Sequence, residues 1–409
     1  MSRKKLVVVG GGAAGFFCAV NAARLNPLLE VIILEKTNKL LSKVKVSGGG
    51  RCNVTHNCFD VSEMSKSYPR GSNFVKKTFY QFFTPDTVKW FAERGVPLKT
   101  ESDGRMFPVT DSSQTIIECL LREADKYGVK IKLNREVKSL ISERGGFTLE
   151  LNNDSPISCD FVCIACGGYP KQGMFDWIKL TGHLIEKPVP SLFTFNTPGN
   201  SIRELMGISV ERVRVKLAGL KLEQEGPLLI THWGLSGPAI LKLSAWGARE
   251  LAKSEYRFTT IINWIPDFNE HTLKNQIQEF RKIKGGQKIG SRNSFALPQR
   301  LWEFLLNGSD IKTKNRWGDL TSSEQNKLIK NLLIFEINIS GKTTFKEEFV
   351  TCGGVKLSEV DPQTMMSRKM HGLYFGGEVL DVDGITGGFN FQYAWTSGFI
   401  AAKSIASSF

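Results

Sequence analysis

A six-residue segment near the N-terminus has the residue types and spacing of a cradle for nucleotide phosphates. Gly10, Gly12 and Gly15 form a G-x-G-x-x-G pattern between an apolar stretch and a run of small residues. Glycines there permit a tight turn and close approach of a pyrophosphate, and the following helix supplies unpaired N–H groups. Glu35 lies twenty residues after Gly15, where a carboxylate can accept both ribose hydroxyls. Because this residue is an acid rather than arginine, the pattern favours an adenosine ribose without a phosphate, which means FAD or NAD.

A second segment, Ser47 to Asn53, has the sequence Ser-Gly-Gly-Gly-Arg-Cys-Asn. Three consecutive glycines disfavour both helix and strand, and they offer exposed amides to a phosphate or a planar ring. Lys43, four residues upstream, can neutralise a phosphate. A plain surface loop with a solvated lysine is the alternative interpretation.

A third glycine-rich region lies near the C-terminus. It contains Gly376-Gly377-Glu378 and then Gly387-Gly388-Phe389-Asn390 before a helix. The glycine pair offers N–H groups to an anion or a flavin carbonyl, and Glu378 can hold ribityl hydroxyls. An enzyme that uses only a nicotinamide needs one such cradle. Three cradles at opposite ends of the chain indicate a long ligand, and FAD is the natural candidate.

The elements that must position these residues follow a β-α-β pattern, which predicts a parallel sheet. The expected elements of this part are strands at 5–9, 30–34, 128–141, 146–151, 161–165 and 372–375, and helices at 13–25, 85–94, 112–127 and 390–406. From about residue 190 the pattern changes to alternating strands, including 210–217 and 257–265, and then to helices at 267–283, 298–306 and 322–334. We therefore expect an α/β fold: a Rossmann-type domain from 1–190 and 345–409, interrupted by an insert at 191–344. The insert is expected to be β-rich at 191–266 and 335–344 and helical at 267–334.

The composition excludes several classes of protein. Of 409 residues, 41% are hydrophobic and 23% are charged, so the chain has material for a core and is not disordered. No apolar run reaches the roughly 18 residues that a membrane-spanning helix needs. The eight cysteines follow no disulfide framework, and Cys163 and Cys166 lack a second pair to complete a metal site. We therefore expect a reduced, cytoplasmic protein with no membrane partner and no metal.

The positive charge of the chain is concentrated in one part of the insert. The formal net charge is +14, which favours an anionic partner. Phe295, Trp302 and Trp317 are interleaved with basic residues, a combination that suits single-stranded RNA. The alternative is a solvated helical face with core aromatics. Between residues 281 and 330 four acids oppose eleven basic residues: Arg281, Lys282, Lys284, Lys288, Arg292, Arg300, Lys312, Lys314, Arg316, Lys327 and Lys330.

Taken together, these motifs resemble the bacterial BaiN/YhiN-like, or aminoacetone-oxidase-like, FAD-dependent flavoproteins. The resemblance covers nearly the whole chain and rests on Gly10–Gly15, Ser47–Asn53, Thr231–Ala239, Cys352–Val355, Leu373–Asp383 and Thr386–Asn390. It implies an FAD domain of the glutathione-reductase type interrupted by a barrel-like β and helical insert. Members of the family have been linked to dihydrouridine formation in ribosomal RNA, and others to reduction of conjugated enones in steroid-like acids.

The resemblance also implies which residues hold FAD. The sequence departs from the family pattern at His56 and at 169–176. These departures leave the residues at the edges of the substrate pocket unassigned, but they do not affect the flavin site. The implied contacts are the pyrophosphate with Gly10, Gly12, Ala14 and Gly15; the adenosine with Glu35 and Val137; and the flavin end with Lys43, Gly48, Arg51, Cys52, Asn53, Glu378, Gly388, Phe389 and Asn390. Further cofactor contacts are expected from Ala13, Lys36, Ser47, Gly49, Ala165, Cys166, Gly167, Gly377 and Gly387.

The chemistry of the flavin remains to be assigned. The sequence has no second dinucleotide fingerprint, so we expect NAD(P)H to act as a transient reductant without its own β-α-β unit. Cys52 is the first candidate for a proton donor or acceptor, with a packing role as the alternative, and His232 is the second candidate. We therefore expect an FAD-dependent, NAD(P)H-driven reductase of an activated C=C bond, with a ribosomal RNA uridine as leading substrate. A small-molecule reductase or amine oxidase, and an RNA-binding flavoprotein with structural FAD, are the alternatives. The oligomeric state is left open.

Overall fold

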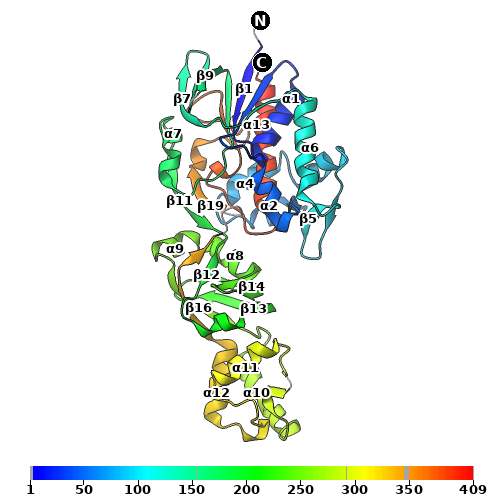
Figure 1. The fold of residues 1–409 in the computed structure, drawn as a ribbon, viewed down its shortest axis with the longest axis vertical. Coiled ribbons are helices and arrows are strands. Elements are labelled where there is room, and N and C mark those ends of the chain that lie inside the picture. Colours follow the sequence, from blue (N-terminus) through cyan, green and yellow to red (C-terminus); the bar gives the residue numbers. More distant parts are fainter. Residues whose placement is uncertain (1–2, 153, 292, 345–349, 409) are drawn as a thin grey trace. The chain divides into compact units, whose positions relative to one another are not determined.

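A computed structural model of the chain describes residues 3–152, 154–291, 293–344 and 350–408 (Figure 1). The chain divides into two compact units. The first is Met1–Ser191 together with Phe345–Phe409, and the second is Leu192–Thr344. Each unit has its own hydrophobic core.

The first unit is built on a five-stranded parallel sheet in the order β20-β10-β1-β2-β6. Its central strands are almost entirely apolar because both faces of the sheet are covered. The C-terminal strand β20 lies in the same sheet as the N-terminal β1, which confirms the α/β class and the Rossmann-type sheet. The strands are β1 (Lys5–Val9), β2 (Glu30–Leu34), β6 (Lys130–Lys132), β10 (Phe161–Ile164) and β20 (Leu373–Phe375).

Two helices from opposite ends of the chain, α1 (Ala13–Leu25) and α13 (Phe389–Ala406), pack closely together (Figure 1, blue and red). A glycine makes the close approach feasible, because a Cβ added at Gly398 would lie 2.6 Å from the backbone oxygen of Ala14. Trp395 on α13 also contacts Phe17 on α1, with ring centroids 5.3 Å apart. This contact fixes the third glycine-rich region beside the first.

The remaining elements of the first unit surround this core. The single strand expected at 128–141 is wrong, because Asn134 takes a left-handed conformation (φ 54°) and separates β6 from β7. The two strands therefore enter different sheets. The small sheets are β3-β5-β4, β7-β8-β9 and the pair β11-β19. These strands are β3 (Thr55–His56), β4 (Leu98–Thr100), β5 (Arg105–Pro108), β7 (Val137–Glu143), β8 (Gly146–Leu151), β9 (Asp154–Cys159), β11 (Ile185–Ser191) and β19 (Val350–Val355), and the helices are α2 (Ser42–Gly50), α3 (Val61–Ser65), α4 (Ser72–Phe79), α5 (Thr84–Ala92), α6 (Ser113–Lys126) and α7 (Asp176–Lys179).

The second unit contains a seven-stranded antiparallel sheet in the order β17-β16-β13-β14-β15-β12-β18. Along β13, Val210, Val213, Val215 and Leu217 are buried, and the step between the first two is a bulge against β14. The strands are β12 (Thr194–Asn196), β13 (Ser209–Leu217), β14 (Glu223–Ile230), β15 (Gly234–Ser236), β16 (Arg257–Asn263), β17 (Phe335–Ser340) and β18 (Lys342–Thr343).

The helices of the second unit bury apolar stripes around two tryptophans, Trp302 and Trp317. The predicted capping box is present, because Thr321 and Glu324 exchange side-chain to backbone hydrogen bonds of 3.2 and 2.8 Å. None of the described helices in either unit has the length and hydropathy that crossing a membrane would require. The helices of this unit are α8 (Pro238–Trp246), α9 (Ala248–Lys253), α10 (Glu270–Ile283), α11 (Gln299–Asn307) and α12 (Ser322–Leu333).

Candidate functional site

The first glycine loop connects β1 to α1 and depends on three glycines for different reasons. Gly10 has φ 115°, and a Cβ there would lie 2.5 Å from the backbone oxygen of Ala165. At Gly15 a Cβ would lie 2.0 Å from the oxygen of Gly10, so this glycine is required by packing alone. A Cβ on Gly12, the N-cap of α1, would meet nothing within 4 Å. The helix N-terminus, which has no side-chain cap, therefore faces open space.

Glu35 follows β2 and is held next to this loop. One carboxylate oxygen accepts the backbone N–H of Gly11 at 2.9 Å, and the other accepts the N–H of Thr37 at 2.9 Å. The Thr37 hydroxyl also donates to the second of these oxygens, at 2.9 Å, so the oxygen that faces Gly11 is the one that keeps an acceptor position for a ribose hydroxyl. The segment leading into Val137 lies alongside, because the N–H groups of Arg135 and Asn134 donate to the carbonyls of Glu35 and Thr37.

The second glycine loop ends α2. The helix loses helical geometry at Ser47, Gly48 and Gly49, and both of these glycines have positive φ angles. A Cβ on Gly49 would meet nothing within 4 Å, so this loop also borders open space. The side-chain amide of Asn53, oriented by its neighbours, donates to the carbonyl of Thr55 and accepts the N–H of Gly388. This loop is thereby tied to the start of α13.

Arg51 already has partners within the protein. Its guanidinium lies 2.5 Å from a Glu101 oxygen and 4.0 Å from the ring centroid of Phe107. The hydrogen bond to Glu101 raises the pKa of Arg51. Its charge is matched by Glu101, between β4 and β5, and this ion pair ties the second glycine loop to that pair of strands.

Cys52 lies in the same loop with its side chain fully buried. Burial raises the pKa of its thiol to about 12, so the thiol stays protonated at neutral pH and is a weak acid. His232, the second candidate for proton transfer, lies in a turn of the second unit, where its ring contacts Trp233. The geometry favours a packing role for Cys52, which was the alternative for this residue.

The third glycine region follows β20. Gly377 has φ 72°, and its N–H donates to Ser397 Oγ at 2.8 Å. The Glu378 carboxylate spans two elements: one oxygen lies 2.5 Å from Lys43 Nζ, and the other accepts the N–H of Thr351 at 2.8 Å. This ion pair joins residues that lie 335 positions apart. It links the second glycine loop directly to the third.

Further along, Gly387 and Gly388 take φ angles of 133° and 93° before α13. Phe389 is buried, with its ring 4.7 Å from that of His56. The Asn390 amide bonds both the N–H and the carbonyl of Gly384, at 2.8 and 2.9 Å. The Gly388 N–H donates to Asn53 and its carbonyl accepts the N–H of Gln392, so hydrogen bonds within the protein fix the shape of this loop.

A fourth segment, Ala165 to Gly168, follows β10 at the same edge of the sheet. Gly167 has φ 76°, and a Cβ there would meet nothing within 4 Å. Burial raises the pKa of Cys166 to about 11. Lys36 lies over the Tyr169 ring, 5.3 Å from its centroid. Ligands of open α/β sheets bind outside these strand ends.

Two residues near this edge were not anticipated from the sequence. Thr351 has a buried hydroxyl with no partner among the described residues, and it lies beside Glu378 and Gly168. Ser397 holds Gly377 from within an otherwise apolar helix. A small polar residue in such a helix is a signal that could have identified Ser397, whereas Thr351 has no comparable signal.

These features fit a long dinucleotide ligand. A Cβ added at Gly12, Gly49 or Gly167 would meet no atom within 4 Å, and the orphaned Thr351 hydroxyl lies beside Gly168 of the fourth segment. The four segments come from the carboxyl ends of β1, β10 and β20 and from the end of α2. The residues present therefore fit FAD. Among the described residues, no group of three or more metal-ligating side chains is found.

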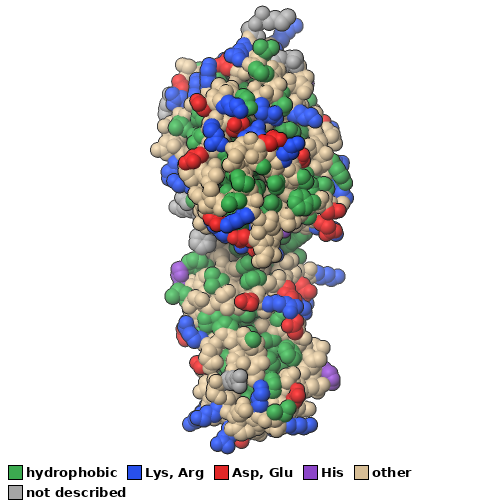
Figure 2. Space-filling model, turned by 90° about the vertical axis from the view of Figure 1, so that its right-hand side faces the viewer, with side chains coloured by type: hydrophobic (Ala, Val, Ile, Leu, Met, Phe, Trp, Pro, Cys, Tyr) green, Lys and Arg blue, Asp and Glu red, His purple; other side chains and the backbone are tan. Residues whose placement is uncertain are grey.

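A separate candidate region lies in the second unit. Residues 284–291 and 312–318, which we call the basic ribbon, are joined by an antiparallel bridge between Lys288 and Arg316. Backbone hydrogen bonds of 2.8 and 3.0 Å from Ile289 and Gly290 extend the pairing. Figure 2 shows lysine and arginine side chains on the part of the second unit that carries α10–α12. Exposed basic residues without an ion pair to any described residue, in the ribbon and just before it, are Lys282, Lys288, Lys312, Lys314 and Arg316.

The expectation that Trp302 and Trp317 offer platforms for RNA bases is wrong. They are 0% and 1% exposed, and Trp302 donates its indole N–H to the carbonyl of Ile289. Their burial follows from the apolar stripe that each shares with core residues. Phe295 is partly exposed and remains available. Arg292, counted among the basic residues of the insert, lies outside the described residues.

Comparisons with known proteins find similarity along nearly the whole chain. The family described as HI0933-like protein Rossmann domain matches residues 4–404. A protein of Escherichia coli (strain K12) named ribosomal RNA dihydrouridine synthase is 31% identical, over 100% of this chain and 99% of its own length. A protein of Clostridium scindens named 3-dehydro-bile acid delta(4,6)-reductase is 28% identical, over 98% of this chain and 99% of its own. Among solved structures, 3-ketosteroid-delta4-(5alpha)-dehydrogenase from Rhodococcus jostii RHA1 shares the fold, with a TM-score of 0.53 at 12% identity, covering 100% of this chain and 98% of that one.

Proposed function

The chain belongs to the HI0933-like Rossmann-domain family and is an FAD-dependent oxidoreductase, and on that premise we propose that it reduces an activated C=C bond. The leading substrate is a uridine in ribosomal RNA, and the product is dihydrouridine. One hydride and one proton add across the bond, so the reaction consumes a two-electron reductant. NAD(P)H is proposed as that reductant, acting transiently because the sequence has no second dinucleotide fingerprint. A cytoplasmic location is part of the proposal.

The observation that carries the oxidoreductase part is the convergence of four backbone segments at one edge of the parallel sheet. In the proposal, the N-terminus of α1 with Gly12 holds the pyrophosphate, and Glu35 holds the adenosine ribose. Lys43 and Glu378, 2.5 Å apart, position the second and third glycine loops around the flavin end. When bound, FAD supplies hydride chemistry at its ring. The chain's own groups bind and orient the FAD and exclude water from the side of the cofactor that faces the protein.

The ribosomal RNA substrate is supported by two independent observations. A relative named ribosomal RNA dihydrouridine synthase is similar over the full length, and the insert carries exposed, unmatched basic residues. Phosphates of an RNA are the natural partners of such side chains, because each neutralised phosphate releases a counterion.

Mapping of dihydrouridine across ribosomal RNA tests the proposal. The map is compared between a strain lacking the gene, the same strain complemented with the natural chain, and one complemented with Gly12→Ala. We expect the deletion to lose one site, the natural chain to restore it, and the variant to fail. An unchanged map in the deletion strain would overturn the RNA substrate.

A second candidate, reduction of a small conjugated enone, is favoured by the full-length similarity to the relative named as a bile acid reductase. Anaerobic reoxidation of the reduced flavoprotein by enones and amines would detect it. The remaining alternative is an RNA-binding flavoprotein with structural FAD. Tight RNA binding and reduction by NADH, with no turnover of any acceptor, would identify that case.

A further inference from the structure

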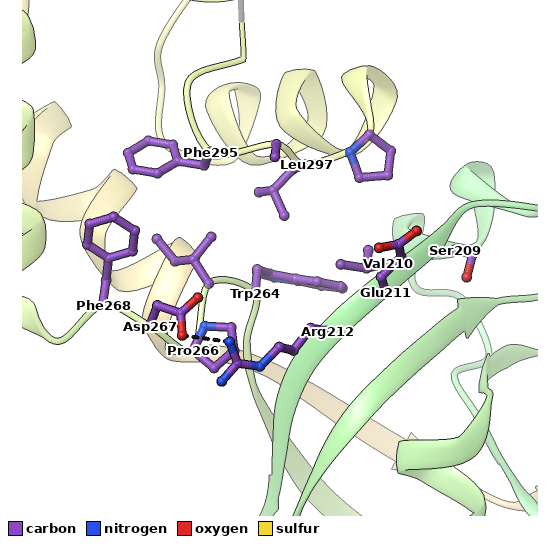
Figure 3. A pocket seen from close by; sticks show the side chains of 13 residues that line it. Ser209, Val210, Glu211, Arg212, Trp264, Pro266, Asp267, Phe268, Phe295 and Leu297 are labelled. Carbon is purple, nitrogen blue, oxygen red and sulfur yellow. Dashed lines mark hydrogen bonds and ion pairs between the residues drawn. The ribbon is translucent and has the colours of Figure 1, made fainter. Parts of the chain in front are cut away.

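A groove in the second unit, distinct from the dinucleotide site, has a volume of about 460 Å³. It lies between the start of β13, the β16–α10 connection and the segment before α11 (Figure 3). Figure 3 shows Leu297 on one side of the groove and Trp264 on the other, with Phe268 and Phe295 at one end. This volume lies within the range of sites for small planar ligands.

The groove offers ring contacts, and its charged lining residues are Glu211, Arg212 and Asp267. Phe268 and Phe295 are both partly exposed, and their rings meet edge to face with centroids 5.8 Å apart. Arg212 is already paired with Asp267 at 2.6 Å and with Glu225 at 2.6 Å. The positive charge of Arg212 is therefore neutralised within the protein, so the groove suits a neutral ring better than a phosphate.

The floor of the groove is closed by Trp264, which is only 1% exposed. The accessible ring surface therefore comes from Phe268 and Phe295, which are both partly exposed. Nucleobases present a flat apolar face to such rings.

The groove is continuous with the basic ribbon. Lys284, at the start of the ribbon, places its Nζ 3.4 Å from Ser294 Oγ, and Ser294 immediately precedes Phe295 of the groove. The same Nζ lies 4.3 Å from the ring centroid of Phe280, which in turn contacts Phe295. Lys284 thus connects the aromatic end of the groove to the basic ribbon.

We propose that this groove takes one unpaired base of a single-stranded RNA while the basic ribbon takes the phosphates of the neighbouring nucleotides. The inference rests on the proposed function for its choice of RNA and deepens it by naming a docking site away from the reacting uridine. Aromatic contact provides affinity without strong base preference, and the ribbon provides salt-dependent affinity.

The test is fluorescence anisotropy of a labelled single-stranded RNA of about 12 uridines with the FAD-loaded full chain. We expect Phe268→Leu with Phe295→Leu to weaken binding about tenfold, because leucine keeps the apolar volume and removes the ring. Tyr80→Leu is the matched control, since Tyr80 is a 70% exposed aromatic of the first unit, and it should leave binding unchanged. If the double variant folds and binds FAD but retains full RNA affinity, the groove proposal is overturned.

A second variant avoids the aromatic packing. Ser209 lines the groove and is exposed, so Ser209→Trp would fill the groove without removing a core contact, and we expect a similar loss of affinity. Unchanged affinity in this variant also contradicts the proposal. Displacement of the RNA by polyglutamate, equally from the natural chain and the double variant, would identify a general polyanion surface and likewise overturn it.

The outcomes separate this inference from the proposed function. Binding is measured without turnover, whereas the dihydrouridine map measures turnover. If the deletion strain loses a dihydrouridine site but the groove variants bind RNA normally, the proposed reductase function stands and the proposed groove site is overturned. If the dihydrouridine map is unchanged but the groove variants lose RNA affinity as expected, the groove site stands and the proposed uridine reduction is overturned.

Discussion

Two basic side chains of the second glycine loop and its helix, Lys43 and Arg51, are matched by carboxylates, whereas exposed basic side chains of the basic ribbon are not. Lys43 is paired with Glu378, and Arg51 with Glu101, each at 2.5 Å. On the ribbon, by contrast, exposed Lys288, Lys314 and Arg316 have no ion pair to any described residue.

The difference indicates two modes of recognition in one chain. The first unit presents backbone N–H groups held in fixed positions by glycines, so its affinity depends on shape and little on salt. The ribbon presents unmatched side-chain charges, which are weakly held and strongly screened. A resident cofactor suits the first mode, and a polyanion that must bind and leave suits the second.

The largest expected effect comes from the glycines of the first loop. Gly15→Ala places a Cβ 2.0 Å from the oxygen of Gly10, so we expect it to destabilise the fold by about 3 kcal/mol and to abolish FAD binding. Gly12→Ala meets open space, so we expect it to change the free energy of unfolding by less than about 1 kcal/mol while lowering FAD content at least tenfold. Thermal unfolding and flavin absorbance measure both quantities. Normal FAD content in Gly12→Ala would contradict the assignment of the open space to the cofactor.

A smaller effect is expected from the ribbon. Replacing Lys288, Lys314 and Arg316 with alanine should reduce the slope of log K against log salt for single-stranded RNA by about 2 and leave FAD content unchanged. The control replaces three lysines that are already paired, Lys66, Lys253 and Lys274. An equal loss of slope in the control would assign the effect to net charge rather than to the ribbon.

The smallest effect concerns Cys52 and is absent at neutral pH. Burial raises its pKa to about 12, above the ordinary value of about 8.5. The folded state therefore holds this proton more tightly, and the resulting stability is complete below about pH 8.5 and is lost as pH rises towards 12. We expect Cys52→Ala to flatten the decline in the free energy of unfolding between about pH 9 and 11, by about 1 kcal/mol per pH unit. Denaturant unfolding at several pH values measures this decline.

The same variant separates a packing role from a catalytic one. With a packing role, the single-turnover rate of flavin reoxidation at pH 7 stays close to that of the natural chain. A large fall in that rate with FAD still bound would restore Cys52 as the proton donor.

Local sequence determined the glycine loops and the elements beside them. Gly10, Gly377 and Gly388 adopt positive φ angles that other residues rarely take, so their type alone marks a loop. Strand β1 and helix α1 begin and end where their apolar and small-residue patterns do. These features depend on near neighbours in the chain, and near neighbours are what a sequence displays.

Only the tertiary structure decided which distant groups meet. The pairing of Lys43 with Glu378 and the bridge between Lys288 and Arg316 depend on how the chain ends and the loops pack, and no local pattern encodes that register. The burial of Trp302 was partly readable, because Leu301, Trp302, Leu305 and Leu306 form an apolar stripe at helical spacing. The residues against which such a stripe packs come from distant parts of the chain. Which aromatic side chains stay accessible to solvent therefore became visible only in the folded second unit.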